Sequence, residues 1–335
     1  MSSVPQIIKS VFPGRKVVII GDLVADQFLH GTITRVSREA PVFILRHDET
    51  DTVPGGAANA AANVAALGGE PILIGVVGGD ANGGLLIDSL ERSGVNCHSV
   101  VTDNAFRTTT KVRVLAGQDY APRQQVIRID YASRAEIGAK ARNEMIDNLR
   151  NTAADTAAII VSDYNYGVAD ASILSAARRV SKERSIPLIV DSRFRLHEFR
   201  DATSATPNQE EVEMILGKGF TDGDCAKLRE DLSFDALLVT CGNEGMLLLE
   251  SNSEPRRIPV VGSAQPVDVT GAGDTVIAAY ALGLASGLSF GDAARVANHA
   301  GGIVVMKKGT AVASADELLA SIAADESTRQ LETAV

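Results

Sequence analysis

A glycine-rich turn that leads into an apolar helical stretch carries the clearest chemical signal in this sequence. It reads Asp268-Val-Thr-Gly-Ala-Gly-Asp274 and is followed by TVIAAYALGLASG. Free backbone N–H groups and the helix dipole at such a turn form a site for a phosphate or another anion. The carboxylate of Asp274 would oppose an anion unless it faces an acceptor hydroxyl and takes its proton during group transfer. The alternative is a plain helix N-terminal carboxylate beside a tight turn.

A second glycine turn, Pro54-Gly55-Gly56-Ala57-Ala58-Asn59, also leads into a helical stretch, and two carboxylates, Asp22 and Asp26, follow the first apolar run. Each carboxylate can accept hydrogen bonds from two hydroxyl groups, which suits a sugar. Asp22 either binds substrate or caps the turn, and the sequence favours neither role over the other. Taken alone, the two glycines are also compatible with an ordinary turn before a helix.

Together the two glycine turns resemble the paired signatures of the ribokinase-like (PfkB) carbohydrate kinase family. The D-x-T-G-A-G-D run is similar to the family's C-terminal signature and the G-G-x-x-x-N run to its N-terminal one, and the likeness extends over about residues 16–318. It implies that Asp274 is the catalytic base. The amides implied to stabilise the transferring phosphoryl group are those of Gly271, Ala272 and Gly273. The implied sugar contacts are Asp26, Gly55, Gly56 and Asn59.

The same resemblance implies ATP as the phosphoryl donor and Mg²⁺ as its companion ion. Thr206-Pro-Asn208-Gln-Glu-Glu211 is similar to the family's N-x-x-E motif, in which Asn208 and Glu211 would organise magnesium and phosphate through water. The implied nucleotide contacts are Thr240, Gly242, Gly245, Asn298 and Gly309. Asn298 could equally satisfy buried backbone groups, and an isolated N-x-x-E is more often the start of a surface helix. Some members of the family need a monovalent cation, so activation by K⁺ stays open.

Four segments are similar to one subgroup of that family, the kinases that phosphorylate D-glycero-D-manno-heptose 7-phosphate at its anomeric hydroxyl. They read GDLVADQFLHGTITRVSREAPV, PGGAANAAANVAALGG, RTTTKVRVLAGQDYAPRQQVIRID and VSDYNYG. A substrate phosphate needs basic partners, and the third segment supplies Arg107, Lys111, Arg113, Arg123 and Arg128. Alternation along a strand puts Lys111 and Arg113 on the same face. We expect Lys111, Arg113 and Arg128 at the substrate site, although such side chains also serve as solvated guards of a sheet edge.

The chain departs from that subgroup in two places. The segment after Ser162-Asp163-Tyr164 reads Asn165-Tyr166-Gly167 without the usual lysine, and the later Asp-Pro-Lys segment reads Asp191-Ser-Arg193. Both changes alter the charge near the pocket, so fructose, 2-keto-3-deoxygluconate or a nucleoside remain alternative substrates. A catalytically silent sugar sensor of the same fold is the alternative from another functional class. The nucleotidyl-transferring domain of many such proteins is not found in this sequence, so we expect no adenylylation.

Short apolar runs alternate with helical stretches, which predicts an α/β fold with a doubly wound, mostly parallel sheet and helices on both faces. The expected strands are Lys16–Ile20, Pro71–Val77, Ala157–Val161, Ile186–Val190 and Ala236–Val239. The expected helices are Ala57–Leu67, Gly84–Arg92, Ala135–Arg150, Ala171–Arg184 and Thr275–Ala285. Ligands of such sheets bind beyond the carboxyl ends of the strands. The polar residues there are Asp22, Asp80, Asp163, Asp191 and Thr240. We expect Asp163 to contact the substrate, and Asp22 as well unless it caps the turn.

Two interruptions, at about residues 31–53 and 107–129, alternate apolar with polar residues, as in Thr110-Lys111-Val112-Arg113-Val114. This alternation predicts antiparallel strands outside the main sheet. We expect both segments to form one small β-sheet lid, inserted in a single domain that spans residues 1–335. A sheet exposed on both faces usually needs cover, so we also expect a homodimer through the lids. The tail after Leu319 is expected to fray.

Composition limits the partners of the chain. The formal net charge of −10 and an aromatic content of 4% argue against nucleic acid and anionic membranes as partners. No apolar run is long enough to cross a bilayer, and the N-terminus lacks a signal-peptide pattern. The widely spaced Cys97, Cys225 and Cys241 include no CxxC pair, which indicates reduced thiols in a cytoplasmic protein. The partners that the family resemblance implies, ATP and a small sugar or sugar phosphate, are compatible with this composition.

Overall fold

Strand β1 (Lys16–Gly21) shows why the central sheet lies between two helical layers. Val17 and Ile19 belong to one apolar core, and Val18 and Ile20 belong to another. All four side chains are fully buried, because successive side chains of a strand point to opposite faces of the sheet. A strand buried on both faces requires helices on both sides, and the continuous apolar run of β1 is the sequence signature of that arrangement.

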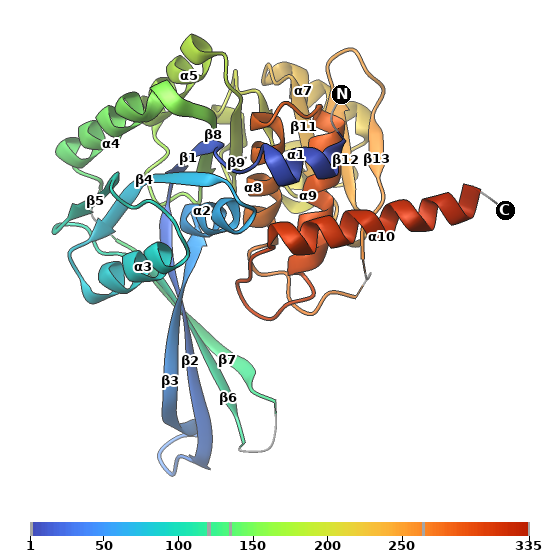
Figure 1. Ribbon diagram of the computed structural model, residues 1–335. Helices are drawn as coiled ribbons and strands as arrows, with labels where there is room; N and C mark the ends of the chain where they lie inside the picture. Colours follow the sequence, from blue (N-terminus) through green and yellow to red (C-terminus); the bar gives the residue numbers. More distant parts are fainter. Residues whose placement is uncertain (1–2, 119–121, 134–135, 263–264, 334–335) are drawn as a thin grey trace.

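The computed structural model describes residues 3–118, 122–133, 136–262 and 265–333 (Figure 1). The strands after β1 are β2 (Leu23–Val36), β3 (Phe43–Gly56), β4 (Glu70–Gly78), β5 (Val100–Asp103), β6 (Thr109–Gly117), β7 (Gln124–Tyr131), β8 (Thr156–Asp163), β9 (Leu188–Ser192), β10 (Ser204–Ala205), β11 (Ala236–Thr240), β12 (Met246–Glu250) and β13 (Arg256–Ile258). The helices are α1 (Val4–Ser10), α2 (Ala57–Ala66), α3 (Ala81–Arg92), α4 (Ala139–Thr152), α5 (Ala171–Arg184), α6 (Gln209–Leu216), α7 (Asp222–Asp231), α8 (Ala272–Ala285), α9 (Phe290–Val304) and α10 (Ala315–Thr333).

The central sheet has the strand order β13-β12-β11-β10-β9-β8-β1-β4-β5 (Figure 1). Neighbours pair in parallel from β5 to β11, and β12 and β13 pair antiparallel. The predicted α/β fold with a mostly parallel sheet is confirmed, and all five expected strands are present. Sequence analysis missed β5, β10, β12 and β13. Of these, β10 has two residues and β13 three, which is too short for a period to show.

Helices α2, α8 and α9 pack in the core on one face of the sheet, and α4, α5 and α7 pack in the core on the other. The expected helix Ala135–Arg150 begins at Ala139, and residue 135 lies outside the described residues. Helix α10 runs to Thr333, so regular structure extends beyond Leu319, where we expected the chain to fray. Within the described residues, none of the helices combines the length and apolar character needed to cross a membrane.

Four strands form a second sheet, in the order β3-β2-β6-β7, which projects from the domain as a long twisted ribbon (Figure 1). The lid is antiparallel within the hairpins β2–β3 and β6–β7 only, because β2 and β6 run parallel. Its strands also begin nearer the domain than expected: β2 starts at Leu23 and β3 ends at Gly56. The lid therefore includes Asp26 and Gly55. Residues 119–121 of the expected segment 107–129 lie outside the described residues.

Candidate active site

Asp274 lies in the first turn of α8 and is buried. Asn59 Nδ2, from α2, donates to Asp274 Oδ2 at 2.8 Å, and the Tyr164 hydroxyl donates to Asp274 Oδ1 at 2.9 Å. Both hydrogen bonds favour the ionised carboxylate. Burial has the larger effect and raises the pKa of Asp274 to about 6. Such a carboxyl group is ionised at neutral pH yet accepts a proton more readily than a surface aspartate, which suits a general base.

A chain of buried polar side chains fixes the orientation of Asn59. Asn63, one turn further along α2, donates to Asn59 Oδ1 at 3.2 Å, and Thr275 Oγ1 donates to Asn63 Oδ1 at 2.8 Å. All three residues are buried. Because Asn59 Oδ1 accepts from Asn63, the amide nitrogen of Asn59 is the group that faces Asp274. The network therefore sets one of the two hydrogen bonds that the base receives.

Asp22 holds the loop that carries Tyr164. Its carboxylate accepts from the backbone N–H groups of Tyr164, Tyr166 and Val168 at 2.8, 2.9 and 3.0 Å. The side chain is buried, and burial raises its pKa. Three amide donors occupy its two oxygens, so the geometry favours the second of the two roles considered for Asp22, a cap on the turn, over a contact with the substrate.

Asp163 is occupied in a similar way. Arg195 Nη2 donates to Asp163 Oδ1 at 2.6 Å, and Ser192 Oγ donates to Asp163 Oδ2 at 2.7 Å. The side chain is buried. Asp163 therefore ties the end of β8 to the segment that follows β9. This geometry does not support the substrate contact that we expected for it, because both oxygens are already bonded to protein donors.

Gly271 caps the N-terminus of α8 with a φ of +79°, a left-handed conformation that favours glycine. A Cβ at Gly271 would lie 2.6 Å from Asn59 Nδ2, so a larger residue would displace a donor to the base. The N–H of Ala272 donates to Val269 O at 3.2 Å. Within the described part of the chain, the amides of Gly271 and Gly273 have no such backbone partner, and a Cβ at Gly273 would meet open space. An anion can thus approach this helix end.

Asp26 lies on β2, where the lid joins the domain. Arg113 Nη1 donates to Asp26 Oδ1 at 2.7 Å. A Cβ at Gly55 would lie 2.5 Å from Asp26 Oδ2, so the glycine leaves room for this second oxygen. Gly56 has a φ of +59° and turns the chain from β3 into α2. Asp26 Oδ2 accepts no hydrogen bond from a described residue, so it is available to a sugar hydroxyl.

Most of the expected basic cluster is neutralised within the lid. The ion pairs are Arg113 with Asp26 at 2.7 Å, Arg123 with Asp48 at 2.8 Å and Arg128 with Asp130 at 2.8 Å. Lys111 is different, since it forms no ion pair with a described residue, and its Nζ lies 5.1 Å from the centre of the Tyr164 ring. Lys111 and Arg113 do share one face of β6, as their positions opposite Asp26 and Phe28 of β2 show.

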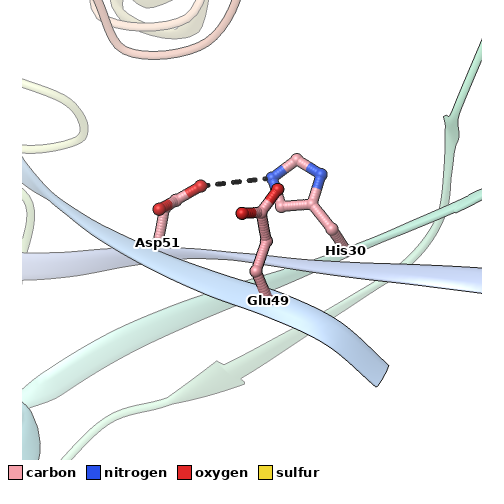
Figure 2. A group of neighbouring side chains, drawn as sticks. All are labelled: His30, Glu49 and Asp51. Carbon is pink, nitrogen blue, oxygen red and sulfur yellow. Dashed lines mark ion pairs between the residues drawn. The ribbon is translucent and has the colours of Figure 1, made fainter. Parts of the chain in front are cut away.

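A cavity of about 1140 Å³ lies between the lid, α3 and the loops that precede α8 and follow α9. His30 and Asp51 of its lid wall, together with the neighbouring Glu49, bring ligand atoms within 4.8 Å of one another (Figure 2). His30 lies opposite Glu49 in the β2–β3 pairing, and its Nε2 is 3.5 Å from Asp51 Oδ2. Neither Asp274 nor Glu211 belongs to this group. It is therefore distinct from the residues expected to handle phosphate.

The N-x-x-E motif forms a capping box at the start of α6. The N–H of Glu211 donates to Asn208 Oδ1 at 2.9 Å, and the N–H of Asn208 donates to Glu211 Oε2 at 2.8 Å. Thr240, at the end of β11, bridges to Asn208. The structure thus brings these three residues together at the carboxyl edge of the sheet. Burial raises the pKa of Glu211, and its Oε1 is left for a ligand or water.

The other expected nucleotide residues serve the local backbone. Asn298 Nδ2 donates to Pro259 O at 2.7 Å, which matches the alternative that it satisfies a buried carbonyl. Gly242 and Gly245 have φ values of +56° and +88°, and a Cβ at Gly245 would collide with the carbonyl of Ile258. Gly309 lies on the wall of the large cavity, and its N–H donates to Asp268 Oδ2 at 2.9 Å. Its nearest neighbours outside its own loop include Phe28 of the lid.

Residues 15–317 match the model of the pfkB family of carbohydrate kinases. The chain belongs to this family. The bifunctional protein HldE of Citrifermentans bemidjiense is 39% identical over 313 residues, which cover 92% of this chain and 63% of that protein. The bifunctional protein HldE of Geobacter sulfurreducens is 37% identical over 311 residues, which cover 91% of this chain and 62% of that protein. The chain therefore spans a little under two thirds of the length of these relatives.

Solved structures share the fold of this pfkB kinase. Ribokinase from Arabidopsis thaliana, complexed with ribose and ATP, superposes with a TM-score of 0.71 at 22% identity, over 92% of this chain and 98% of that chain. Phosphofructokinase-2 from Escherichia coli, in complex with substrates and products, gives a TM-score of 0.74 at 19% identity over the same shares of 92% and 98%. The predicted ribokinase-like fold is confirmed, and the match to the pfkB family of carbohydrate kinases supports the predicted enzyme class, a phosphotransferase that acts on a sugar hydroxyl.

Sequence reasoning assigned no role to three side chains at the kinase site: Asn63, Tyr164 and Arg193. Asn63 had a usable signal, because it lies four residues after Asn59 in a helix that otherwise consists almost entirely of alanine, and this spacing places both amides on one face. Tyr164 directly follows Asp163 at the end of β8, and Arg193 directly follows Ser192 at the end of β9. Nothing local marks either of them as a neighbour of Asp274.

Proposed function

We propose that this pfkB kinase transfers the γ-phosphoryl group of ATP to the anomeric hydroxyl of a heptose 7-phosphate, with Asp274 as the base. The observation that carries the reaction is the buried carboxylate at the open N-terminus of α8, held by Asn59 and Tyr164. The four segments similar to heptose 7-phosphate kinases support the choice of sugar. The HldE proteins, which match over nine tenths of this chain, are compatible with it.

In this mechanism the sugar binds between the domain and the lid, where Asp26 Oδ2 accepts from its hydroxyl groups. The O–H bond of the acceptor hydroxyl breaks and its proton passes to Asp274. The hydroxyl oxygen bonds to the γ-phosphorus, while the bond from that phosphorus to the β,γ-bridging oxygen breaks and its electron pair leaves with ADP. The amides of Gly271 and Gly273 stabilise the negative charge on the γ-phosphoryl group during its transfer. The lid keeps out water, which would otherwise compete as acceptor.

Two acidic side chains at the carboxyl edge of the sheet fit Mg²⁺. The carboxylate of Asp191 accepts no hydrogen bond from a described residue, and burial, followed by the nearby charge of Glu211, raises its pKa. Two neighbouring carboxyl groups whose charges repel each other offer the oxygen ligands that a hard divalent cation prefers, and the cation would offset their repulsion. Glu211 would hold the ion through water, with Asp191 beside it. The ion would neutralise charge on the phosphates of ATP.

A neutral sugar is the second candidate substrate, because Arg113 and Arg128 already pair with lid aspartates. A heptose 7-phosphate would instead use cations that form no ion pair with a described residue. Of these, Arg92 and Lys308 line the large cavity, and Lys111 lies on β6 two residues before Arg113, which also lines it. Binding of a phosphate to such cations costs less free energy than binding to arginines that must first leave a close ion pair.

The test is ADP release with ATP and Mg²⁺ over a panel of sugars and sugar phosphates, run with the Asp274→Asn variant as the blank. The assay is repeated in KCl and in NaCl to measure any activation by K⁺. Turnover that is strongest with heptose 7-phosphate and lost in the variant would support the proposal. Turnover on neutral sugars alone would reject the phosphosugar and keep the base. If no sugar were turned over, a silent sensor would be favoured.

We also propose that two copies associate through the outer face of the lid. Ile127 and Ile129 alternate with Arg128 on β7 and are 54% and 39% exposed. They share a face with Tyr131, which is 37% exposed. A second copy of this amphipathic sheet would cover the apolar face.

The three unpaired cysteines support a reducing compartment, the cytoplasm.

A further inference from the structure

The ring of Tyr164 lies near two cations and next to the base. Lys111 Nζ, from the lid, lies 5.1 Å from the ring centre, and Arg193 Cζ, from the segment after β9, lies 5.5 Å from it. The hydroxyl of the same tyrosine donates to Asp274 Oδ1 at 2.9 Å. Two positive charges from separate sheets thus converge on the side chain that contacts the base.

Neither cation has a carboxylate partner within the described part of the chain. Lys111 is only 7% exposed, and a buried ammonium group without a counter-ion is costly unless a ligand supplies the opposite charge. Aromatic faces offset part of that cost, and Tyr166 adds a second ring at 5.8 Å. Asp26 and Asp274 act on Lys111, and Asp191 acts on Arg193, only from beyond ion-pairing distance, so an anionic ligand between the two cations would supply the close partner that both lack.

Arg193 also differs from the arginine two residues further on. Arg195 is committed to the fold, because its Nη2 donates to Asp163 Oδ1 and to Ala169 O. The guanidinium of Arg193 has no hydrogen bond to a described residue, and the side chain is exposed. It lines a cavity of about 290 Å³ together with Glu211 of the N-x-x-E motif. Arg193 therefore connects the phosphate edge of the sheet with the surroundings of the base.

We propose that Arg193, together with Lys111, contacts the γ-phosphoryl group while it passes from ATP to the sugar. Arg193 would approach from the main sheet and Lys111 from the lid. A guanidinium group presents parallel N–H donors that match two oxygens of a phosphoryl group, and an ammonium adds a point charge. The cations form no covalent bond, so the proton still goes to Asp274 and the electron pair still leaves with ADP. The inference rests on the proposed role of Asp274.

The competing explanation is that Arg193 only stacks on Tyr164 and keeps that ring in place. We would compare Arg193→Met and Arg193→Lys with Arg200→Met, a matched control in the same segment. Arg200 is exposed, and its Nη1 donates to the carbonyl of Asp231 at 2.9 Å. If Arg193 contacts the γ-phosphoryl group during its transfer, Arg193→Met should lower kcat roughly 10²- to 10³-fold with little change in the KM for ATP. Arg193→Lys should recover part of this loss, and Arg200→Met should behave as the wild type.

A second readout does not depend on the identity of the sugar. The affinity of the protein for a fluorescent ADP analogue is measured in the presence of Mg²⁺, once with and once without aluminium fluoride. Aluminium fluoride imitates the phosphoryl group during its transfer. The gain in affinity caused by aluminium fluoride should fall at least tenfold in Arg193→Met, and should persist in Arg200→Met.

If aluminium fluoride increased the affinity for the ADP analogue as much in Arg193→Met as in the wild type, the inference would be overturned, even if the kcat of the variant were low. An arginine that only supports the fold would affect binding equally with and without aluminium fluoride. A kcat within threefold of the wild type would also overturn it. Loss of activity in Asp274→Asn alongside a fully active Arg193→Met would reject the role of Arg193 and leave the proposed function in place. If Asp274→Asn retained wild-type activity, the proposed role of the base would fail independently of Arg193.

Discussion

Replacement of Asp274 by asparagine is expected to abolish turnover and, at the same time, to stabilise the folded chain at neutral pH. The substitution keeps the shape of the side chain and removes its charge. The introduced amide oxygen can still accept from Asn59, and its nitrogen can donate to the Tyr164 hydroxyl, which accepts as well as donates. The variant thus loses the proton acceptor and keeps a hydrogen bond at both ends of the side chain, while the Tyr164 hydroxyl changes from donor to acceptor and must direct its own proton elsewhere.

The size of the effect follows from the pKa of Asp274, which burial raises from 3.8 to about 6. A folded-state pKa above the unfolded value means that stability is fully present below pH 3.8 and is lost as the pH rises to about 6. A shift of about two units corresponds to roughly 3 kcal/mol. For a chain of 335 residues, this raises the melting temperature of the variant by about 4 °C above that of the wild type at pH 8.

Thermal unfolding at pH 8 and at pH 4 measures this difference, which should nearly vanish at pH 4 because the wild-type carboxyl group is then protonated. Asp268→Asn is the matched control in the same turn. Hydrogen bonds from Thr270 and Gly309 outweigh burial and lower the pKa of Asp268, so its variant should be less stable than the wild type at pH 8. In parallel, the kcat of Asp274→Asn should fall by roughly 10²- to 10⁴-fold. A variant that melts below the wild type at pH 8, or that keeps its activity, would refute the reasoning.

Three further predictions concern the supports of the site. Gly271→Ala should lower kcat roughly tenfold or more with little change in the KM for ATP, because the added methyl group would lie 2.6 Å from Asn59 Nδ2; wild-type kinetics would contradict this. Asp22→Asn should lower the free energy of unfolding by roughly 1–3 kcal/mol, because an amide nitrogen would face backbone N–H groups such as that of Tyr164. Urea denaturation measures this loss, and a variant as stable as the wild type would assign the loop another support. Ile127→Glu should convert the proposed dimer to a monomer in sedimentation velocity, since it places a charge on the apolar face of the lid; a dimer of unchanged strength would place the interface elsewhere.

The main sheet could be predicted from the sequence because its signal is local. Residues Val17–Ile20 of β1 are all apolar, and this pattern is sufficient to indicate a strand covered on both faces. The lid was found by its alternation, but its starting residue was not. The strand β2 begins at Leu23 inside an apolar stretch, where alternation has not yet started. The parallel pairing of β2 with β6 depends on contacts between segments far apart in the chain, which no local period encodes.

The base could be predicted from its glycine turn, whereas its neighbours could not. Asn59 and Tyr164 lie 215 and 110 residues from Asp274 along the chain. Only the fold brings them within hydrogen-bonding distance of the carboxylate. The same holds for charge: Arg113 reads as a free cation in the sequence, yet it faces Asp26 across the lid and is neutralised there. Residue type and spacing identify candidates, and cross-strand register decides which of them stay available to a ligand.

The pairing of β2 with β6 links sugar binding to the chemistry of transfer. Asp26 and Lys111 lie directly opposite each other on these strands. The proposed sugar ligand and the proposed phosphoryl ligand are therefore carried by one pair of hydrogen-bonded strands, and a movement of the lid that withdraws one withdraws the other. A sugar that holds the lid through Asp26 also holds Lys111 against Tyr164 and next to the base. A water molecule in place of the sugar does not hold the lid through Asp26, so Lys111 is then not fixed next to the base. This coupling predicts that ATP hydrolysis is slow in the absence of sugar.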